Sequence, residues 1–481
     1  MSTTAQLSAR ERIISLLDDN SFVEVGACVT QRSTDFNLQQ KDIPADGVIT
    51  GYGVIDGNLV YVYSQDSTAL GGSIGEMHAK KIVNIYNLAL KVGAPVIGLI
   101  DCAGFRLQEA TDALNGFGEI YLKQTMASGV IPQINAIFGT CGGGLAVMAS
   151  LSDFTFMEGK NGKLFVNAPN AIGGNYKEKC DTSAASFQAK AGLVDYIGET
   201  DVDVIENIRQ LIRILPSNNE DDASFDECTD DLNRLVSILD TEIKDTKKAL
   251  VALSDNHFFF EVKSSYAKEM VTGFIRLNGM TIGAVANRTA ICDDDSKVTE
   301  KFDGSLTTAG CYKAESFVKF CDAYNIPILS LTNVNGYKAT IEEEGTIAIA
   351  AAKLTYAFAN ASVAKINVIV GKAYGGAYIT MNSKHIGADM VFALTNTEIG
   401  MMDATLAAQI MYAEEAKKSI EILKEKAAQY ATLQSSAEAA AKRGYVDCII
   451  EPETLRKHLI YSYEMLFTKR ESRPAKKHGT V

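Results

Sequence analysis

The feature that most restricts the fold of this chain is an α/β pattern that occurs twice, in the same order, along its length. The first copy has a glycine-containing segment at 50–57, a helix-like run at 80–92, an apolar strand at 94–101 and a glycine-rich turn at 139–144. The second copy has the matching features at 272–279, 315–324, 326–331 and 371–377. Pro95 and Gly143 are 48 positions apart, and so are Pro327 and Gly375. The shared order and the equal interval indicate an internal duplication.

Strand and helix patterns alternate within each copy, which predicts the α/β fold class. Residues 48–64 alternate and turn at Asp56-Gly57-Asn58, as expected for a β-hairpin. Residues 74–92 have apolar side chains at helical spacing, and residues 96–100 form an apolar run typical of a strand covered on both faces. A capping box at Ser8 to Glu11 predicts a short helix near the N-terminus.

The domain boundary is predicted from a break in the pattern. A length of 481 residues suits two domains of about 200 residues each. The segment from Pro216 to Asp222 is polar, acidic and without periodicity, which predicts domains at 1–222 and 223–481. After the second copy, residues 414–443 predict one long charged helix that stops at Gly444.

Composition excludes several functions. The net charge of −13 argues against nonspecific binding to nucleic acid or to an anionic membrane. The N-terminus has no signal segment, and no apolar run reaches the ~18 residues that a membrane span needs. The nine cysteines form no CxxC pair and the five histidines are scattered, so we expect free thiols and no bound metal such as zinc. A reducing cytoplasm is the expected location.

The glycine-rich turns are the candidate functional elements. A turn of glycines at the start of a helix lets a ligand approach closely and aims free N–H groups at it. Such amides can hold an oxygen that gains negative charge, although glycines also serve only to allow tight packing. The chain has no Ser-His-Asp pattern, no GxSxG motif and no Walker motif. A reaction at these turns therefore needs a base from a cofactor or from a lone side chain.

Longer motifs across nearly the whole chain resemble one known family. They are Asp46 to Gly51, Gln65-Asp66, Gly71 to Lys81, Ala127 to Gln133, Lys372 to Tyr378 and Lys469 to Gly479. Together they resemble the carboxyltransferase of biotin-dependent acyl-CoA carboxylases and decarboxylases, of the propionyl-CoA carboxylase beta and methylmalonyl-CoA decarboxylase alpha type. The resemblance implies two tandem crotonase-like domains, with acyl-CoA mainly on the first and carboxybiotin mainly over the second. It also implies a site between the first domain of one subunit and the second domain of its neighbour, in a hexamer of three dimers.

The chemistry that this resemblance implies supplies the missing base. When carboxybiotin releases its carboxyl group, the ureido oxygen gains negative charge and the ring nitrogen can take the α-proton of an acyl thioester. The thioester oxygen then becomes an enolate, so two oxyanions need two sets of amides. By resemblance these sets are Gly143 with Gly144 and Gly376 with Ala377. Which set faces biotin is left open.

Other residues are candidates for ligand binding, each with a simpler structural alternative. Lys80 and Lys81 are candidates for the phosphates of coenzyme A, or else solvated lysines on a helix. By resemblance Tyr374 and Gly375 contact the biotin cofactor. Ile379, directly after the second turn, either sizes the acyl pocket or packs in the core.

Arg106 has two interpretations of equal weight. By resemblance it lies beside the site of the first domain and contacts substrate, whereas its alternative is an ion pair with Asp101 or Glu109. Some of its neighbours are expected to be structural, either hydrogen-bonded or packed: His78, Cys102 and Cys141.

Three segments of the second copy depart from the family pattern. Residues 333–337 read Asn-Val-Asn-Gly-Tyr where the family usually has Asp-Thr-Pro-Gly-Phe, residues 347–353 lack the usual Arg-His, and Thr405 replaces a common glutamate. The chain also has no Ala-Met-Lys-Met biotin-attachment motif and no ATP-binding half. The resemblance therefore implies that the biotin carboxyl carrier protein lies on a separate chain, together with a biotin carboxylase subunit or a membrane decarboxylase subunit.

Two alternative functions use the same residues. One is a crotonase-type hydratase, isomerase or thioesterase that works without biotin and takes its base from a side chain such as Glu109. The other is a catalytically silent scaffold of a carboxylase complex, which the altered second-copy segments suggest. The preferred hypothesis is transfer of a carboxyl group between biotin and a short acyl-CoA, such as propionyl- or acetyl-CoA, in a direction that the sequence leaves open.

Overall fold

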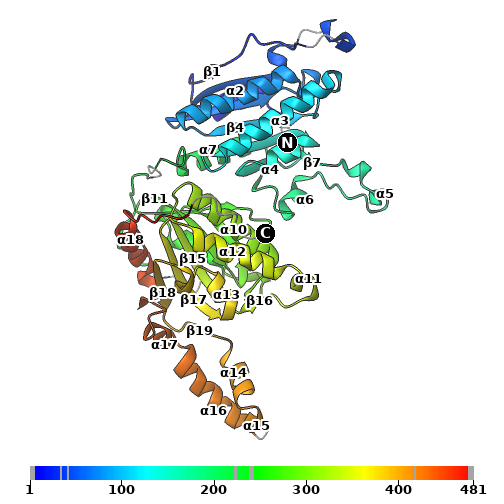
Figure 1. The fold of residues 1–481 in the computed structure, drawn as a ribbon. Coiled ribbons are helices and arrows are strands. Elements are labelled where there is room, and N and C mark those ends of the chain that lie inside the picture. The colour runs from blue at the N-terminus through cyan, green and yellow to red at the C-terminus, as the bar shows by residue number, and fades with distance from the viewer. Residues whose placement is uncertain are drawn as a thin grey trace. The chain divides into compact units, whose positions relative to one another are not determined.

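The structure is a computed structural model that describes residues 6–32, 35–40, 43–221, 225–237, 243–416 and 419–474 (Figure 1). The chain forms two compact units, residues 1–224 and 225–481, each with its own sheet and its own core. Asp222, where the sequence predicts the end of the first domain, lies outside the described residues. So do residues 475–481, which contain the end of the last family motif.

The first unit is built on a mixed, mainly parallel sheet with the order β1-β2-β3-β4-β5-β6-β8, with β7 also paired to β5. Its strands are β1 Val23–Glu24, β2 Val48–Ile55, β3 Asn58–Gln65, β4 Val96–Cys102, β5 Gln133–Gly142, β6 Phe154–Glu158, β7 Lys163–Phe165 and β8 Tyr196–Gly198. β2 and β3 form the predicted hairpin, and both turn residues, Asp56 and Gly57, have positive φ as a two-residue type I′ turn requires. β4 and β5 are buried almost throughout, as expected for parallel strands covered on both faces.

Helices connect these strands. They are α1 Ala9–Leu16, α2 Glu76–Val92, α3 Ala110–Ala127, α4 Gly144–Ser150, α5 Asn175–Glu178, α6 Ala185–Lys190 and α7 Asp201–Ile214. The predicted capping box is present at α1, where Ser8 Oγ accepts the Glu11 amide and the Glu11 carboxylate accepts the Ser8 amide. α2 ends at Gly93, which has a left-handed φ of +68°. α2 and α3 pack side by side (Figure 1).

The second unit repeats the sheet of the first. Its strand order is β20-β18-β17-β15-β11-β10-β9, with β19 paired to β17 as β7 is paired to β5. The strands are β9 Phe260–Val262, β10 Met270–Leu277, β11 Met280–Asn287, β15 Ile328–Val334, β17 Lys365–Tyr374, β18 Met390–Leu394, β19 Glu398–Gly400 and β20 Cys448–Ile450. Two small additional pairs are β12 Ala290–Cys292 with β13 Val298–Lys301, and β14 Ser305–Leu306 with β16 Gly336–Tyr337. The duplication inferred from the sequence is therefore confirmed in the topology.

The two units also agree residue by residue. β4 and β15 begin 232 positions apart, and so do β5 and β17. The first amide of β5, on Gln133, donates to the Asp153 carboxylate at 2.8 Å. The first amide of β17, on Lys365, donates to the Asp389 carboxylate at the same distance of 2.8 Å. A constant offset of 232 therefore identifies equivalent residues from α2 to the glycine-rich turns.

The helices of the second unit are more numerous. They are α9 Thr246–Leu253, α10 Thr308–Ala323, α11 Ile341–Glu344, α12 Ile347–Asn360, α13 Gly375–Thr380, α14 Ala404–Met411, α15 Ala413–Ala416, α16 Ile420–Tyr430, α17 Ala437–Ala441 and α18 Leu455–Leu466. Across the described part of both units, none of the helices combines the length and the apolar character that crossing a membrane requires.

The prediction of one long helix over 414–443 is wrong. α16 passes into a π-helical turn at Ala431–Ser435, and the chain is then extended at Ser436 before α17 begins. Ser436 makes an antiparallel bridge with Glu398, on β19. This tertiary contact outweighs the helix propensity of the segment. In a continuous helix the backbone groups of Ser436 would bond within the helix, whereas here they pair with Glu398 of β19. Gly444 follows α17 with a φ of +78°, as a C-terminal stop requires.

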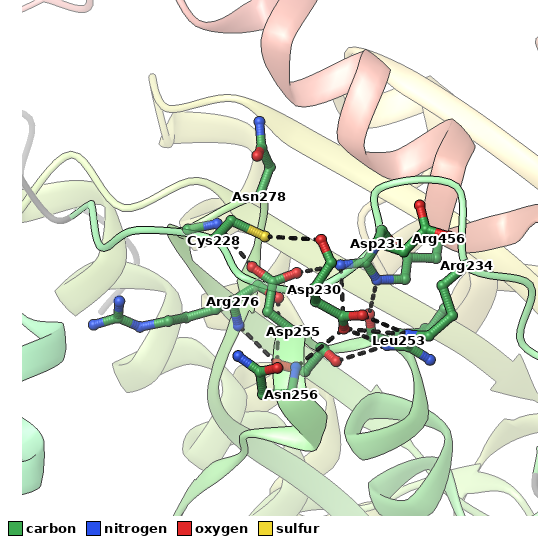
Figure 2. Close-up of polar contacts among 12 residues, drawn as sticks. Cys228, Asp230, Asp231, Arg234, Leu253, Asp255, Asn256, Arg276, Asn278 and Arg456 are labelled. Atoms are coloured by element: carbon green, nitrogen blue, oxygen red, sulfur yellow. Dashed lines mark hydrogen bonds and ion pairs between the residues drawn. The ribbon is translucent and has the colours of Figure 1, made fainter.

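A buried arginine links several segments of the second unit by hydrogen bonds and an ion pair (Figure 2). Arg456, on α18, donates to the Leu253 carbonyl at 3.1 Å and to the Asp231 carbonyl at 2.8 Å. It also pairs with one oxygen of the Asp255 carboxylate, whose other oxygen accepts the Gly279 amide at 2.7 Å. Because Gly279 lies in the turn between β10 and β11, this cluster joins α18 and the start of the unit to the β10-β11 hairpin.

Candidate active site

Each sheet carries a glycine turn at the carboxyl end of a central parallel strand. Gly143 follows β5 with a φ of +64°, and Gly375 follows β17 with a φ of +58°, a region that glycine adopts at no steric cost. The helices α4 and α13 start at Gly144 and Gly375. The first amides of a helix have no intrahelical acceptor, so they remain available to other groups. Both units therefore present main-chain donors where ligands bind in parallel sheets.

One of the four expected donor amides, that of Gly143, is bonded within the protein. The Gly143 amide donates to the Phe165 carbonyl at 2.8 Å because β7 runs beside β5, so this N–H is already engaged. Gly144, the next residue, is partly exposed and is the first residue of α4. In the second turn Gly376 is exposed, whereas Ala377 is fully buried. Gly144 and Gly376 are equivalent in the duplication, and the amides of Gly144, Gly376 and Ala377 all lie in the first turn of their helices. These three amides stay the expected donors.

An aromatic ring packs against each of these glycines. A Cβ atom on Gly144 would lie 3.1 Å from Phe105 Cζ, and one on Gly376 would lie 3.1 Å from Tyr337 Cε2. In the first turn the hydroxyl of Tyr121, on α3, also donates to the Gly144 carbonyl at 2.5 Å. Sequence reasoning missed Tyr121 because only the packing of α3 brings it to the turn. Tyr337 could have been found as a tyrosine at a family phenylalanine position.

The second turn lines a cavity of about 530 Å³ that lies within the second unit. Gly375, Gly376 and Ile379 all contribute to its wall. Ile379 is 41% exposed, so the structure does not place it in the core. Three further residues of the wall are in edge-to-face ring contact: Tyr378, His385 and Tyr445. A largely apolar cavity of this size is typical of a small-molecule site.

Tyr374 has a structural role in the second turn. It is buried, and its hydroxyl donates to the carboxylate of Glu398 on the neighbouring strand β19. Burial, with the adjacent carboxylate, raises the pKa of Tyr374, so the hydroxyl stays protonated. Gly375, the other expected cofactor contact, lines the cavity directly.

Arg106 belongs to a buried ion-pair network that includes Glu109, in agreement with the structural alternative stated for it. Its guanidinium lies 2.5 Å from the Asp46 carboxylate and 2.9 Å from the Glu109 carboxylate, and it donates to the Ser73 carbonyl at 2.8 Å. The second oxygen of Glu109 accepts the amide of Glu76 at 2.6 Å, at the first residue of α2. The Arg106 and Glu109 side chains are 0% and 1% exposed. The network therefore supports the start of α2 and does not reach solvent.

The two adjacent lysines of α2, Lys80 and Lys81, differ in burial and in hydrogen-bond partners. Lys80 is half exposed and pairs with Glu76 at 2.7 Å, so its ammonium group remains accessible to an anion. Lys81 is buried, and its ammonium group donates to the carbonyls of Ala45, at 3.0 Å, and Val48. Burial lowers the pKa of Lys81 to about 8. Lys81 therefore holds backbone in place, which corrects its expected contact with a CoA phosphate.

Three residues expected to be structural are confirmed as such. The His78 ring is fully buried and its Nδ1 lies 3.0 Å from the Asp46 carbonyl oxygen. Burial, with the nearby Arg106 guanidinium, lowers the pKa of His78 to about 3, so the ring is neutral. Cys102 and Cys141 are fully buried, and burial raises both pKa values, that of Cys102 to about 12. These thiols are packing groups.

Two residues of a divergent segment contact the second turn and the strand before it. The Asn333 Oδ1 atom would lie 2.5 Å from a Cβ placed on Gly371, and it accepts the Lys372 amide at 2.9 Å. Tyr337 packs on Gly376 as described above. The departures from the family pattern therefore change side chains beside the turn and leave its backbone intact.

Two tandem crotonase-like α/β units, each with a glycine turn after a central strand, are the fold of a carboxyltransferase, as the whole-length match to a known carboxyltransferase structure shows. The sequence profile of the carboxyl transferase domain matches residues 3–481, so the chain belongs to this family.

The relatives of the chain agree with this assignment. It is 38% identical to the methylmalonyl-CoA decarboxylase subunit alpha of Propionigenium modestum, over 99% of this chain and 93% of the relative. It is 40% identical to the mitochondrial propionyl-CoA carboxylase beta chain of Rattus norvegicus, over 99% of this chain and 88% of the relative. The crystal structure of the transcarboxylase 12S hexamer with hydrolysed methylmalonyl-coenzyme A has a TM-score of 0.92 and 35% identity, covering 99% of this chain and 92% of that chain.

Proposed function

We propose that the chain moves a carboxyl group between carboxybiotin on a separate carrier protein and a short-chain acyl-CoA of the propionyl- or acetyl-CoA type. It is an acyl-CoA carboxyltransferase, in keeping with its family and its whole-length relatives. The names of those relatives refer to methylmalonyl-CoA and propionyl-CoA, which supports a short acyl group.

The observation that carries this proposal is the pair of equivalent turns at Gly144 and Gly376. Carboxyl transfer at the α-carbon of a thioester builds negative charge on the thioester oxygen and on the group that releases the carboxyl. Main-chain donors aimed at such charge lower the barrier without a side-chain nucleophile. The turn of each unit therefore supplies a main-chain hydrogen-bond donor for one of the two oxygens.

The residues beside the second turn fit a biotin ureido ring. Gly375 and Gly376 place no side chain between the cavity and the backbone. The rest of the wall is mainly aromatic and apolar, with Gln434 and Arg443 among its polar members. When bound, carboxybiotin supplies the carboxyl group and the base. The protein then contributes the Gly376 amide as a donor to an oxygen and the ring of Tyr378 to exclude water. Ile379 limits the space next to the turn.

The biotin-independent crotonase-type alternative is disfavoured because its candidate base, Glu109, is buried and already paired. Glu109 is ion-paired with Arg106 at 2.9 Å, accepts the Glu76 amide and is 1% exposed. A substrate proton would reach this carboxylate only after the network had opened, and breaking a buried ion pair costs about 3–5 kcal/mol.

The proposal places the partners on separate chains. They are a biotin carboxyl carrier protein and either a biotin carboxylase subunit or a membrane decarboxylase subunit. A hexamer of three dimers is the proposed assembly, supported by the hexameric transcarboxylase 12S. In this assembly the two kinds of turn come from neighbouring subunits. Large exposed apolar side chains in both units, including Leu107 at 86% and Ile341 at 92%, favour burial against other subunits.

The test is an assay of the purified chain with malonyl-CoA or methylmalonyl-CoA and either free biotin or a biotinylated carrier. We expect decarboxylation or transfer that requires the biotin species with at least one of the short acyl-CoA substrates. No turnover with any short acyl-CoA would overturn the proposal. Turnover of the thioester without biotin would favour the crotonase-type alternative. A strong biotin-dependent rate loss in Gly376→Pro would exclude a silent scaffold, because proline removes the donor amide.

A further inference from the structure

We propose that the hydroxyl of Tyr337 is a further hydrogen-bond donor of the second turn and contacts the same oxygen as the Gly376 amide. This inference rests on the proposed function, because it requires an anion at this turn. The Tyr337 hydroxyl lies 3.3 Å from the position that a Cβ would take on Gly376. A Cβ lies about 2.5 Å from the backbone nitrogen of its own residue, so the Tyr337 hydroxyl is within about 5.8 Å of the Gly376 nitrogen. Two hydrogen bonds to one oxygen span up to about 6 Å, so a single oxygen can accept from both groups.

The position of the ring is determined by the backbone. Tyr337 lies in β16, where it pairs with Leu306 of β14. Its ring packs on Gly376, and this contact is possible because Gly376 has no side chain. At 38% exposure the ring is partly open to solvent, so a ligand at the turn can approach it.

A chain of hydroxyl groups orients the Tyr337 proton. The Tyr337 hydroxyl lies 2.8 Å from Thr380 Oγ1, which lies 3.0 Å from Thr355 Oγ1. Each hydroxyl has one proton to donate, so two links among three hydroxyls leave one proton over. When Thr355 donates to Thr380 and Thr380 donates to Tyr337, the remaining proton points away from the chain at Tyr337. An anion at the turn selects this direction, because a hydrogen bond to a charged acceptor is the stronger one.

The protonation state of Tyr337 suits a donor. Burial raises the pKa of Tyr337 above its ordinary value of 10.0, and the hydrogen bond to Thr380 only partly offsets this. The hydroxyl therefore keeps its proton throughout the neutral range.

At the position equivalent to Tyr337 the first turn carries no hydroxyl. Phe105 takes the place of Tyr337 there and carries no hydroxyl. The hydroxyl of Tyr121 comes near the first turn, but it donates to the Gly144 carbonyl at 2.5 Å and is engaged by the protein itself. The additional donor therefore distinguishes the second turn from the first. It also distinguishes this chain from the family pattern, which has phenylalanine at position 337.

The experiment compares Tyr337→Phe, Thr380→Val and Tyr461→Phe in the biotin-dependent assay. Tyr337→Phe keeps the ring and removes the hydroxyl, and we expect kcat to fall about tenfold or more, with KM for the acyl-CoA and the melting temperature unchanged. Thr380→Val leaves Tyr337 in place but breaks the hydroxyl chain, so a smaller fall in kcat is expected. Tyr461, an exposed tyrosine on α18, is the matched control, and its variant should keep the wild-type kcat.

Four outcomes would overturn the inference. Wild-type kcat in Tyr337→Phe, when Gly376→Pro is inactive, would refute it and leave the proposed function intact. A fall in kcat that comes with a raised KM and a lower melting temperature would assign the hydroxyl a purely structural role. The absence of biotin-dependent turnover in the wild type would refute the proposed function and this inference together. If Tyr337→Phe fails to fold, wild-type kcat in Thr380→Val refutes the inference.

Discussion

Phe105 and Tyr337 occupy the same position in the two units, and each ring packs against the exposed or partly exposed glycine of its turn. Phe105 makes a parallel bridge with Ile74, and Tyr337 pairs in parallel with Leu306, which is the residue equivalent to Ile74. The duplicated units therefore share both the ring and the backbone pairing that holds it. Because the two rings differ by one hydroxyl, the two turns can be compared within a single chain.

Removing the donor amide from either turn should abolish most of the activity. Proline at position 144 or 376 deletes the N–H and is tolerated in the first turn of a helix. Gly144→Ala and Gly376→Ala, which add a Cβ beside the same rings but keep the N–H, are the matched controls. We expect kcat of the biotin-dependent reaction to fall about a hundredfold or more in each variant. Steady-state kinetics measures the loss, and thermal melting checks that the fold is retained. A folded variant with wild-type kcat would show that its turn holds no charged oxygen.

The size of residue 379 should set the preference for acyl length. In the proposed reaction the acyl group meets carboxybiotin beside the second turn, where Ile379 lines the cavity. Ile379→Ala should therefore shift kcat/KM toward longer acyl groups, whereas Ile379→Phe should favour acetyl-CoA. One methylene in an apolar pocket changes discrimination by about tenfold or more. The ratio of kcat/KM for butyryl-, propionyl- and acetyl-CoA is the measurement. Ile349→Ala, at an exposed isoleucine of α12, is the control that should leave the ratio unchanged.

The two adjacent lysines should respond differently to substitution. Lys80→Ala should raise KM for the acyl-CoA about two- to fivefold at low salt, because an exposed ammonium group contributes a weak, screened contact. Lys81→Met should leave KM unchanged but lower the free energy of unfolding by about 1–3 kcal/mol, because two buried carbonyls lose their donor. Kinetics and urea unfolding of both variants separate the two effects. A raised KM in folded Lys81→Met would contradict this assignment.

Acid should destabilise the first unit through His78. The folded-state pKa is lowered to about 3 from an ordinary 6.5, so the unfolded chain binds more protons between these values. The resulting stability is present above pH 6.5 and is lost as the pH falls through this window, by about 2 kcal/mol at pH 5. His78→Gln should have a flatter pH dependence of the urea unfolding midpoint, whereas the exposed His257→Gln should follow the wild type. Parallel curves for wild type and His78→Gln would refute this prediction.

Loss of the buried arginine should destabilise the second unit. Arg456→Met leaves the Asp255 carboxylate without its charged partner, and breaking a buried pair in this way costs about 3–5 kcal/mol (Figure 2). Urea unfolding, followed by circular dichroism, should show the transition of one unit shifted to lower urea. Lys442→Met, at an exposed residue, should leave both transitions in place. An unchanged profile for Arg456→Met would mean that the cluster is not important for stability.

Local chemistry made much of the fold predictable. The Asp-Gly turn at 56–57, the capping box at Ser8 and the glycine turns at 143 and 375 follow from backbone preferences that act within a few residues. The equal spacing of the turns predicted the duplication, because two copies of one unit keep the same interval between equivalent residues. The alternation of strand and helix patterns within each copy predicted the α/β class, because these patterns also depend on nearby residues.

Site residues whose roles depend on distant partners were less predictable. Lys81 has the sequence context of a ligand contact, yet the carbonyls of Ala45 and Val48 accept from its ammonium group. For Arg106 the sequence offered the ion pair with Glu109 as one alternative, but not the pairing with Asp46. Gly143 has the glycine motif of a donor, but the pairing of β7 with β5 engages its amide. Each of these outcomes is decided by a segment far along the chain, which no local pattern specifies.

By itself the sequence determined the class, the duplication and the positions of the two turns, because helix starts, hairpin turns and positive-φ glycines depend on neighbouring residues. Only the tertiary structure decided which amides stay free, which charges are buried and which rings lie over the turns. Burial and hydrogen-bond partners depend on how strands such as β7 and helices such as α3 pack. The hydroxyl of Tyr337 stands beside Gly376 through the pairing of β14 with β16 and its contact with Thr380.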